Sequence, residues 1–180
     1  MRPTSIASAS SGLIPPGLRR RAAALDLSVY RAVTRVRSPR TTPAIRLYSR
    51  LGEHGLLWFA VGAAGMAADR RNRARWRRAT VSVLTAQLTS SAIKLAIGRP
   101  RPVIDSLPHL ISTPTGLSFP SSHASGSFAA ARAYSPLLGA GPLYAAATSM
   151  ALSRIHLGVH YPSDVAAGAA LGTVVGSFGR

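Results

Sequence analysis

Residues 153–164, SRIHLGVHYPSD, place charged and ionisable side chains inside an otherwise apolar part of the chain. Runs of small and apolar residues lie on both sides of this stretch. Arg154, His160 and Asp164 would be costly in such surroundings unless they contacted one another or a charged ligand. We therefore expect a functional site here, served by polar groups from other parts of the chain.

The 180 residues are enough for one domain with a sizeable core. Lys and Arg number 22 against 5 acidic residues, which gives a formal net charge of +17. The arginines concentrate in residues 1–50 and 69–78, and basic segments beside long apolar ones are typical of a membrane protein. Lysine-rich or aromatic-interleaved patches that stack on bases are absent from the sequence, so we predict no nucleic-acid partner.

The first fifty residues are expected to lie outside the main bundle. Residues 1–17 are rich in Ser and Pro without a continuous apolar run, which predicts a disordered tail rather than a signal peptide. Residues 18–50 mix apolar clusters with arginines and predict an amphipathic segment at the membrane interface, where it would contact lipids. Packing on the bundle as an ordinary amphipathic helix is the alternative.

Residues 51–180 predict the bundle itself. The five apolar segments are 55–68, 80–97, 122–138, 143–152 and 165–178. We predict an all-α fold, a membrane bundle of about five spanning helices plus the N-terminal interfacial helix, in the bacterial plasma membrane. Because Gly- and Ala-rich segments this short also occur in soluble bundles, a soluble helical core is the alternative.

Several residues refine this prediction. Residues 69–78, with six arginines, indicate a membrane-surface loop. Ser163 or Asp164 is expected to cap the last helix, whose glycines recur every fourth residue and permit close helix contact. Arg132 falls within the third segment and must face the bundle interior or a partner. Whether the chain forms a homo-oligomer or binds a partner membrane enzyme stays open.

Three polar clusters stand at the ends of the apolar segments, at residues 94–102, 120–123 and 154–164. Counting the crossings places all three at the same face of the bundle. Lys94, Arg101 and Arg154 then form a set of cations suited to a dianionic phosphate. Ser121, Ser122 and the first N–H groups of a helix add a further anion site. The alternative is that each cation extends to lipid headgroups.

The histidines supply the expected chemistry. Asp164 follows His160 by four residues and can hold one ring nitrogen, leaving the other as a nucleophile. His123, from another segment, is placed to protonate a leaving oxygen. His54, His109 and His156 are expected to be structural. Although His156 and His160 share an i, i+4 spacing, no HExxH motif accompanies them, so we predict no metal and no cofactor.

The three clusters resemble the signature of the type 2 phosphatidic acid phosphatase superfamily. The matching stretches are KLAIGRPRP (94–102), PSSH (120–123) and SRIHLGVHYPSD (153–164). The likeness covers residues 50–178. It implies a helical membrane bundle that removes phosphate from lipid phosphates or diphosphates without a metal.

The resemblance also implies residue roles. His160 attacks phosphorus to give a phosphohistidine, Asp164 orients it, and His123 protonates the departing alcohol and then activates water. The phosphate is held by Lys94, Arg101, Ser121, Ser122 and Arg154. The family usually has PSGH, so Ser122 stands where glycine is common and either narrows the pocket or adds a donor. Arg99 is an extra arginine for a second phosphate or for the interface.

The resemblance is less specific about the substrate. Small, Arg-rich and Ala-rich bacterial members look like phosphatases of polyprenyl-linked intermediates, such as decaprenylphosphoryl 5-phosphoribose in cell-wall biosynthesis. Undecaprenyl diphosphate and phosphatidylglycerophosphate are the alternatives. A vanadate-dependent haloperoxidase and a non-catalytic membrane adaptor that binds anionic lipid are the competing functions.

The orientation of the site in the membrane stays open. The arginines of residues 69–78 favour a cytoplasmic loop and hence a site on the outer face, whereas the arginines of the N-terminus favour a site on the cytoplasmic face.

Overall fold

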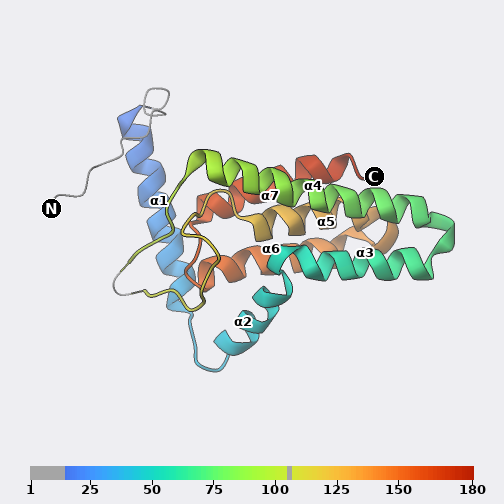
Figure 1. The fold of residues 1–180 in the computed structure, drawn as a ribbon. Coiled ribbons are helices and arrows are strands. Elements are labelled where there is room, and N and C mark those ends of the chain that lie inside the picture. The colour runs from blue at the N-terminus through green and yellow to red at the C-terminus, as the bar shows by residue number, and fades with distance from the viewer. Residues whose placement is uncertain (1–14, 105–106) are drawn as a thin grey trace.

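The computed structural model describes residues 15–104 and 107–180, and within this part the backbone forms seven α-helices and no strand. Helices α1 (Pro16–Arg35) and α2 (Thr42–Leu51) precede the bundle. The bundle helices are α3 (Leu56–Ala68), α4 (Arg73–Ile97), α5 (Ser122–Leu138), α6 (Ala140–His156) and α7 (Pro162–Ser177). They run alternately in opposite directions along one axis (Figure 1). The predicted all-α class is confirmed.

Helix α5 is the centre of the bundle, and α4, α6 and α7 all pack against it. Its sequence explains this position, because nearly all of its inward residues are small. The buried residues of α5 are Ala124, Ser125, Gly126, Ser127, Ala129, Ala130, Ala131, Ala133 and Tyr134. Small side chains let three neighbouring helices approach the same helix closely.

The glycine face of α7 lies directly against the backbone of α5. A Cβ atom added at Gly168 would lie 2.5 Å from the backbone oxygen of Ser121, and one at Gly176 would lie 2.6 Å from that of Ala129. Neither position therefore accepts a side chain without moving a helix. The close contact expected from this four-residue repeat is present.

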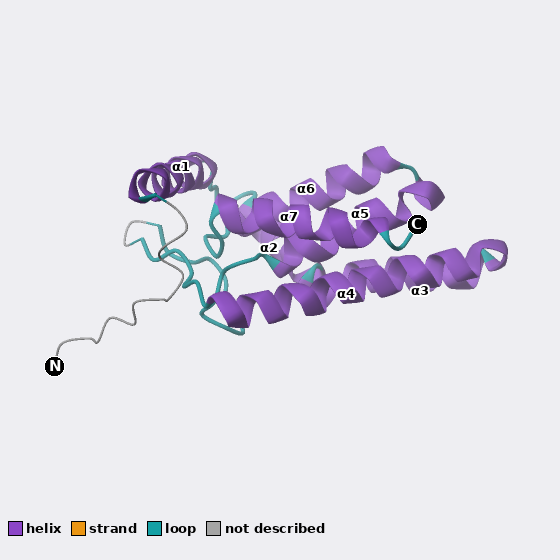
Figure 2. Cartoon of the chain, turned by 90° about the horizontal axis from the view of Figure 1, so that it is seen from above, coloured by secondary structure: helices purple, strands orange, loops and turns teal. Residues whose placement is uncertain are grey.

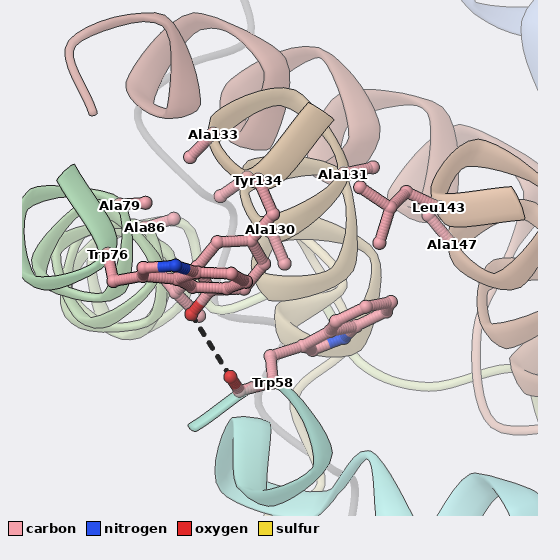
Figure 3. Close-up of a cluster of buried hydrophobic side chains, with 12 residues drawn as sticks. Trp58, Trp76, Ala79, Ala86, Ala130, Ala131, Ala133, Tyr134, Leu143 and Ala147 are labelled. Atoms are coloured by element: carbon pink, nitrogen blue, oxygen red, sulfur yellow. Dashed lines mark hydrogen bonds between the residues drawn. The ribbon is translucent and has the colours of Figure 1, made fainter. Parts of the chain in front are cut away.

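Aromatic residues fill much of the core where α3, α4 and α5 meet (Figure 3). The rings of Trp76 and Tyr134 have centroids 5.3 Å apart, and the Tyr134 hydroxyl donates to the backbone oxygen of Trp58 at 3.0 Å. The Trp58 indole in turn donates to the Ser127 hydroxyl at 2.9 Å. The two hydrogen bonds join α3 to α5 and satisfy polar atoms of the aromatic side chains, and the Trp76 ring packs α4 against α5.

Helix α1 lies across the opposite end of the bundle, roughly perpendicular to its axis (Figures 1 and 2). The predicted amphipathic segment, residues 18–50, lies in α1 and α2, which are separated by a break at residues 36–41. Large apolar residues of α1, including Leu18 and Leu25, are exposed. Residues 1–14 of the predicted disordered tail lie outside the described residues, and α1 begins at Pro16, within the range predicted for that tail.

Three predicted boundaries were wrong. The arginine-rich loop is shorter than residues 69–78, because η2 (Arg70–Asn72) leads directly into α4 at Arg73. The Asp69 carboxylate caps this turn by accepting the Asn72 backbone N–H. Helix α6 begins at residue 140 and continues to residue 156, well beyond the predicted 143–152. Tyr161, not Ser163 or Asp164, is the N-cap of α7.

One helical stretch among the described residues, Arg70–Ile97, is long and apolar enough to cross a membrane by itself. Helices α5 and α6 have 17 residues each, which at 1.5 Å per residue gives a length of about 25 Å.

Arg132 of α5 was expected to face the bundle interior or a partner. Its side chain extends to α7, where Nε donates to the Ser177 hydroxyl at 3.1 Å.

We expect Gly172→Ala to lower the free energy of unfolding by about 2 kcal/mol, because overpacking against α5 outweighs the gain in helix propensity. A Cβ at Gly172 would lie 2.9 Å from the Ala129 backbone nitrogen. Gly141→Ala in α6 is the matched control, since its Cβ would meet nothing within 4 Å. Thermal unfolding in detergent measures both. Equal stability of the two variants would contradict the close α5–α7 contact.

Candidate active site

Four helix ends meet at the end of the bundle that α1 crosses (Figures 1 and 2). These are the C-termini of α4 and α6 and the N-termini of α5 and α7. The segment between α4 and α5 is described at residues 98–104 and 107–121. This loop is closed on itself by the Ser118 N–H, which donates to the Arg99 oxygen at 2.7 Å, and by the Arg101 N–H, which donates to the Gly116 oxygen at 3.1 Å.

A cavity of about 360 Å³ opens at this end. It is lined by six of the eight site residues that the sequence predicted: Lys94, Arg101, Ser122, His123, Arg154 and His160. The other two, Ser121 and Asp164, are fully buried behind the cavity. Segments more than sixty residues apart in sequence therefore converge at one place, as the count of crossings requires.

Lys94, Arg101 and Arg154 are the cavity cations, and backbone oxygens hold two of them. Arg101 donates from Nε to the Thr115 oxygen at 2.9 Å and from Nη1 to the Val159 oxygen at 2.6 Å. Lys94 Nζ donates to the Pro120 oxygen at 2.6 Å and to the Ser118 oxygen at 3.2 Å. Because these acceptors are neutral, they orient the cations without cancelling their charge.

Arg154 lies in the last turn of α6 and is almost completely buried. Its Nη1 donates to the hydroxyl of Ser49, which comes from α2. Its Nε has no hydrogen-bond partner. A buried donor without a partner is unfavourable unless a ligand occupies it, so Arg154 is suited to bind an anion that enters the cavity.

His160 lies in the short loop between α6 and α7, and its two ring nitrogens face different groups. Nδ1 is 3.6 Å from the Asp164 carboxylate, and Nε2 is 3.3 Å from Arg101 Nη1. Asp164 is itself held by the Tyr161 N–H, which donates to Oδ2 at 2.8 Å. A proton on Nδ1 would face the carboxylate and leave the Nε2 lone pair directed toward the cations.

The charge state of His160 follows from its surroundings. Burial lowers the pKa of the His160 imidazole well below its ordinary value of 6.5, and the cavity cations lower it further. Both effects disfavour a second positive charge on the ring. At neutral pH the ring is therefore uncharged and keeps the lone pair that a nucleophile needs.

The residues at the start of α5 have separate positions. The Ser121 hydroxyl accepts the Ala124 N–H at 3.4 Å as the N-cap, so it faces the helix end rather than the cavity. Ser122 lines the cavity, and its hydroxyl lies 3.0 Å from that of Ser90 on α4. The His123 Nε2 atom is buried without a partner, which leaves it available to a group inside the cavity.

Several site residues had no signal in the sequence. Glu53 and His54, at the turn before α3, line the cavity, together with Gln87 of α4 and residues 112–115 of the loop. None of them belongs to one of the three motifs. His54 was predicted to be structural, and it is exposed beside the cavity instead.

Arg99 differs most from expectation. It donates to Asp164 Oδ1 at 2.7 Å and to Asp26 Oδ2 at 2.9 Å, so it is paired with two carboxylates rather than open to a second phosphate. Its guanidinium also lies over the Tyr161 ring, 4.2 Å from the centroid. Asp26 belongs to α1 and was not singled out by any pattern.

The donors at the site suit a phosphate group. Residues 15–104 and 107–180 contain no group of three or more His, Asp or Glu side chains placed to hold a metal ion. Cations, an unpartnered guanidinium nitrogen and the N-terminus of α5 instead converge on one cavity. Such a set stabilises a phosphoryl group, and the two imidazoles can supply a nucleophile and a proton.

Comparison with known proteins agrees with this chemistry. Residues 75–179 match the PAP2 superfamily. The decaprenylphosphoryl-5-phosphoribose phosphatase of Mycobacterium tuberculosis is 40% identical over 129 residues, which cover 72% of this chain and 73% of the relative. The protein of the same name from Mycolicibacterium smegmatis is 36% identical over 130 residues, 72% of each chain.

Two solved structures share the fold. Aquifex aeolicus LpxE aligns with a TM-score of 0.74 at 23% identity, covering 86% of this chain and 94% of that one. A transmembrane PAP2-type phosphatidylglycerolphosphate phosphatase from Bacillus subtilis aligns with a TM-score of 0.70 at 22% identity, covering 86% and 82%. The chain belongs to the PAP2 superfamily of phosphatases, and its fold is a helical membrane bundle.

We expect the His160 ring to remain neutral at pH 6, because burial and the cavity cations lower its pKa. Nuclear magnetic resonance of the enzyme labelled at histidine measures this, and His160→Gln identifies the signal by its disappearance. As the pH falls, the ring should gain its proton only well below 6.5. A midpoint at or above 6.5 would contradict the environment described for His160.

Proposed function

We propose that this protein is a multi-pass enzyme of the bacterial plasma membrane that removes the terminal phosphate from a polyprenyl-linked phosphoribose, decaprenylphosphoryl-5-phosphoribose. The observation that carries the proposal is the convergence of the three cavity cations on His160 and His123. Membership of a phosphatase superfamily supports the reaction class. The site residues and their roles are part of the proposal.

In the first step the His160 Nε2 lone pair attacks phosphorus, and the bond between phosphorus and the ribose oxygen breaks. His123 gains a proton when the anionic phosphate binds beside it, and it gives this proton to the departing oxygen, so the product leaves as an alcohol. Asp164 faces Nδ1 from 3.6 Å and stabilises the positive charge that develops on the His160 ring. The phosphoryl group is now bound to His160 through a P–N bond.

In the second step water replaces the nitrogen. His123, now neutral, takes a proton from the water molecule, whose oxygen attacks phosphorus. The P–N bond breaks, inorganic phosphate forms, and the electron pair returns to Nε2. The proton taken by His123 restores the starting state.

The cavity cations act in both steps by stabilising charge on the equatorial oxygens of the phosphoryl group. The free Nε of Arg154 and the Nη1 of Arg101, which lies 3.3 Å from His160 Nε2, are placed for this role. The first N–H groups of α5 and the Ser122 hydroxyl add neutral donors on the other side. Because Ser121 is the N-cap, we assign its contribution to the helix end rather than to its hydroxyl.

The lipid character of the substrate follows from the cavity wall. Leu84 and Leu88 of α4 line the cavity and are also exposed on the outside of the helix. The cavity therefore continues from the cationic end toward the side of the bundle that faces lipid. A long apolar chain can lie along these leucines while its headgroup enters the polar end.

The choice of headgroup comes from the relatives. Those 36–40% identical over 72% of the chain are named for decaprenylphosphoryl-5-phosphoribose. The bacterial plasma membrane is where such a lipid would be met. Helix α1, with exposed Leu18 and Leu25 beside arginines, is suited to lie at the interface near the site.

Purified enzyme in detergent should release phosphate from decaprenylphosphoryl-5-phosphoribose, and His160→Ala should release none above background, because the nucleophile is lost. Addition of a strong chelator should leave the rate unchanged, since the proposed steps use only side chains. Undecaprenyl diphosphate and phosphatidylglycerophosphate serve as comparison substrates. Equal release by His160→Ala would exclude the enzyme proposal and favour an adaptor, whereas loss of activity with chelator would exclude the metal-free steps.

The roles of the two histidines can be separated by trapping. With p-nitrophenyl phosphate, whose leaving group needs no proton, we expect His123→Ala to accumulate a phosphoenzyme because water is no longer activated. Mass spectrometry of the alkali-quenched protein should locate the phosphate on residue 160. The double variant His123→Ala/His160→Gln should carry no phosphate. A phosphorylated double variant would place the intermediate elsewhere.

A further inference from the structure

Asp26 is a buried carboxylate on α1 that belongs to none of the three motifs. Its Oδ1 accepts the Ser163 backbone N–H at 2.8 Å, and its Oδ2 accepts the Ser163 hydroxyl at 2.6 Å. Oδ2 also forms the 2.9 Å ion pair with Arg99. Burying a carboxylate is unfavourable unless such partners compensate it. All of these partners lie beside residues 157–161, the loop between α6 and α7 that carries His160 and is called the catalytic loop below.

Arg99 connects Asp26 to the site. One guanidinium nitrogen, Nη2, pairs with Asp26, while the other, Nη1, donates to Asp164 Oδ1 and to the Ser163 hydroxyl, each at 2.7 Å. Because the guanidinium is planar, fixing one nitrogen fixes the direction of the other. Asp26 therefore determines how Arg99 approaches Asp164.

Arg99 occupies one oxygen of Asp164 and leaves the second for the catalytic loop. Oδ2 accepts the Tyr161 N–H and lies 3.6 Å from His160 Nδ1. If the guanidinium moved, the Asp164 carboxylate could rotate and the oxygen that faces His160 would change. The orientation of the imidazole is thus linked to α1 through two ion pairs.

Two more contacts join α1 and its C-terminal end to residues before His160, whereas the Asp26–Ser163 bonds lie after it. The Tyr30 hydroxyl donates to the Gly158 oxygen at 3.2 Å, and Arg37, just beyond α1, donates from Nε to the His156 oxygen at 2.8 Å. Gly158 has a φ of 86°, so the loop turns there in a conformation that side chains rarely adopt. Polar groups from one helix and its end bind the loop before and after His160.

We propose that Asp26 is a positioning residue of the phosphatase, acting through Arg99 on the Asp164–His160 pair. This inference rests on the proposed function, in which His160 is the nucleophile. It also gives α1 a role beyond contact with the membrane surface, because the helix would align the catalytic loop. Removing the Asp26 charge should affect the chemical step more than substrate binding.

We expect Asp26→Asn to lower kcat roughly tenfold, as loss of an outer-layer partner commonly does, while KM stays within about twofold of the parent value. Phosphate release is measured at a temperature where the variant is fully folded, with decaprenylphosphoryl-5-phosphoribose as substrate. Asp69→Asn is the matched control, because Asp69 accepts bonds from Asn72 and Trp76 at the far end of the bundle. It should lower stability and leave kcat unchanged.

A double variant tests the route. If Asp26 acts through Arg99, Asp26→Asn/Arg99→Gln should lose no more kcat than Arg99→Gln alone. Losses that multiply, or an Asp26→Asn enzyme with parental kcat, would overturn the inference. If Asp26→Asn does not fold, Arg99→Lys tests the same link, since an ammonium cannot bridge both carboxylates in this geometry; parental kcat in that variant would also overturn it.

His160→Ala distinguishes the two proposals. When His160→Ala is inactive and Asp26→Asn has parental kcat, the proposed function stands and the positioning role fails. When His160→Ala is as active as the parent, the proposed function fails, and the positioning role fails with it.

Discussion

The contact between α5 and α7 is the constraint on which the rest of the structure depends. Gly168 and Gly176 bring the backbone of α7 against that of α5, where no side chain fits between them. As a result the Ser121 N–H reaches the Asp164 backbone oxygen at 2.9 Å. This single bond joins the two helix N-termini that carry His123 and Asp164, so the relative position of these two side chains follows from helix packing.

The arginines and lysine of this end fall into two electrostatic groups. The cavity cations are held by neutral oxygens, and the ion pairs among the described residues involve Arg99 and His160 but none of these three. Arg99 alone is neutralised by carboxylates. Positive charge therefore remains uncancelled inside the cavity, where we propose that the phosphate binds, and it is cancelled at Arg99, outside the cavity.

The N-terminal helices are part of the site as well as its surroundings. Ser49 of α2 accepts from Arg154, and Asp26 of α1 accepts from Arg99. The bundle helices could bring the motifs together without these residues, but the side chains would be less constrained. With α1 at the membrane surface, as we propose, these contacts would link the position of the protein at the interface to the geometry of the cavity.

The sequence by itself determined the helical class, the approximate bundle helices and the convergence of three polar clusters, because apolar periodicity and crossing number depend on local composition. It also indicated six residues that line the cavity. Only the tertiary structure decided that Ser121 is a cap, that Arg99 is paired with two carboxylates, and that Asp26 and Ser49 reach the site. The pairs that involve Arg99, Asp26 and Ser49 join residues 65 or more positions apart in the chain, and no local pattern records such contacts.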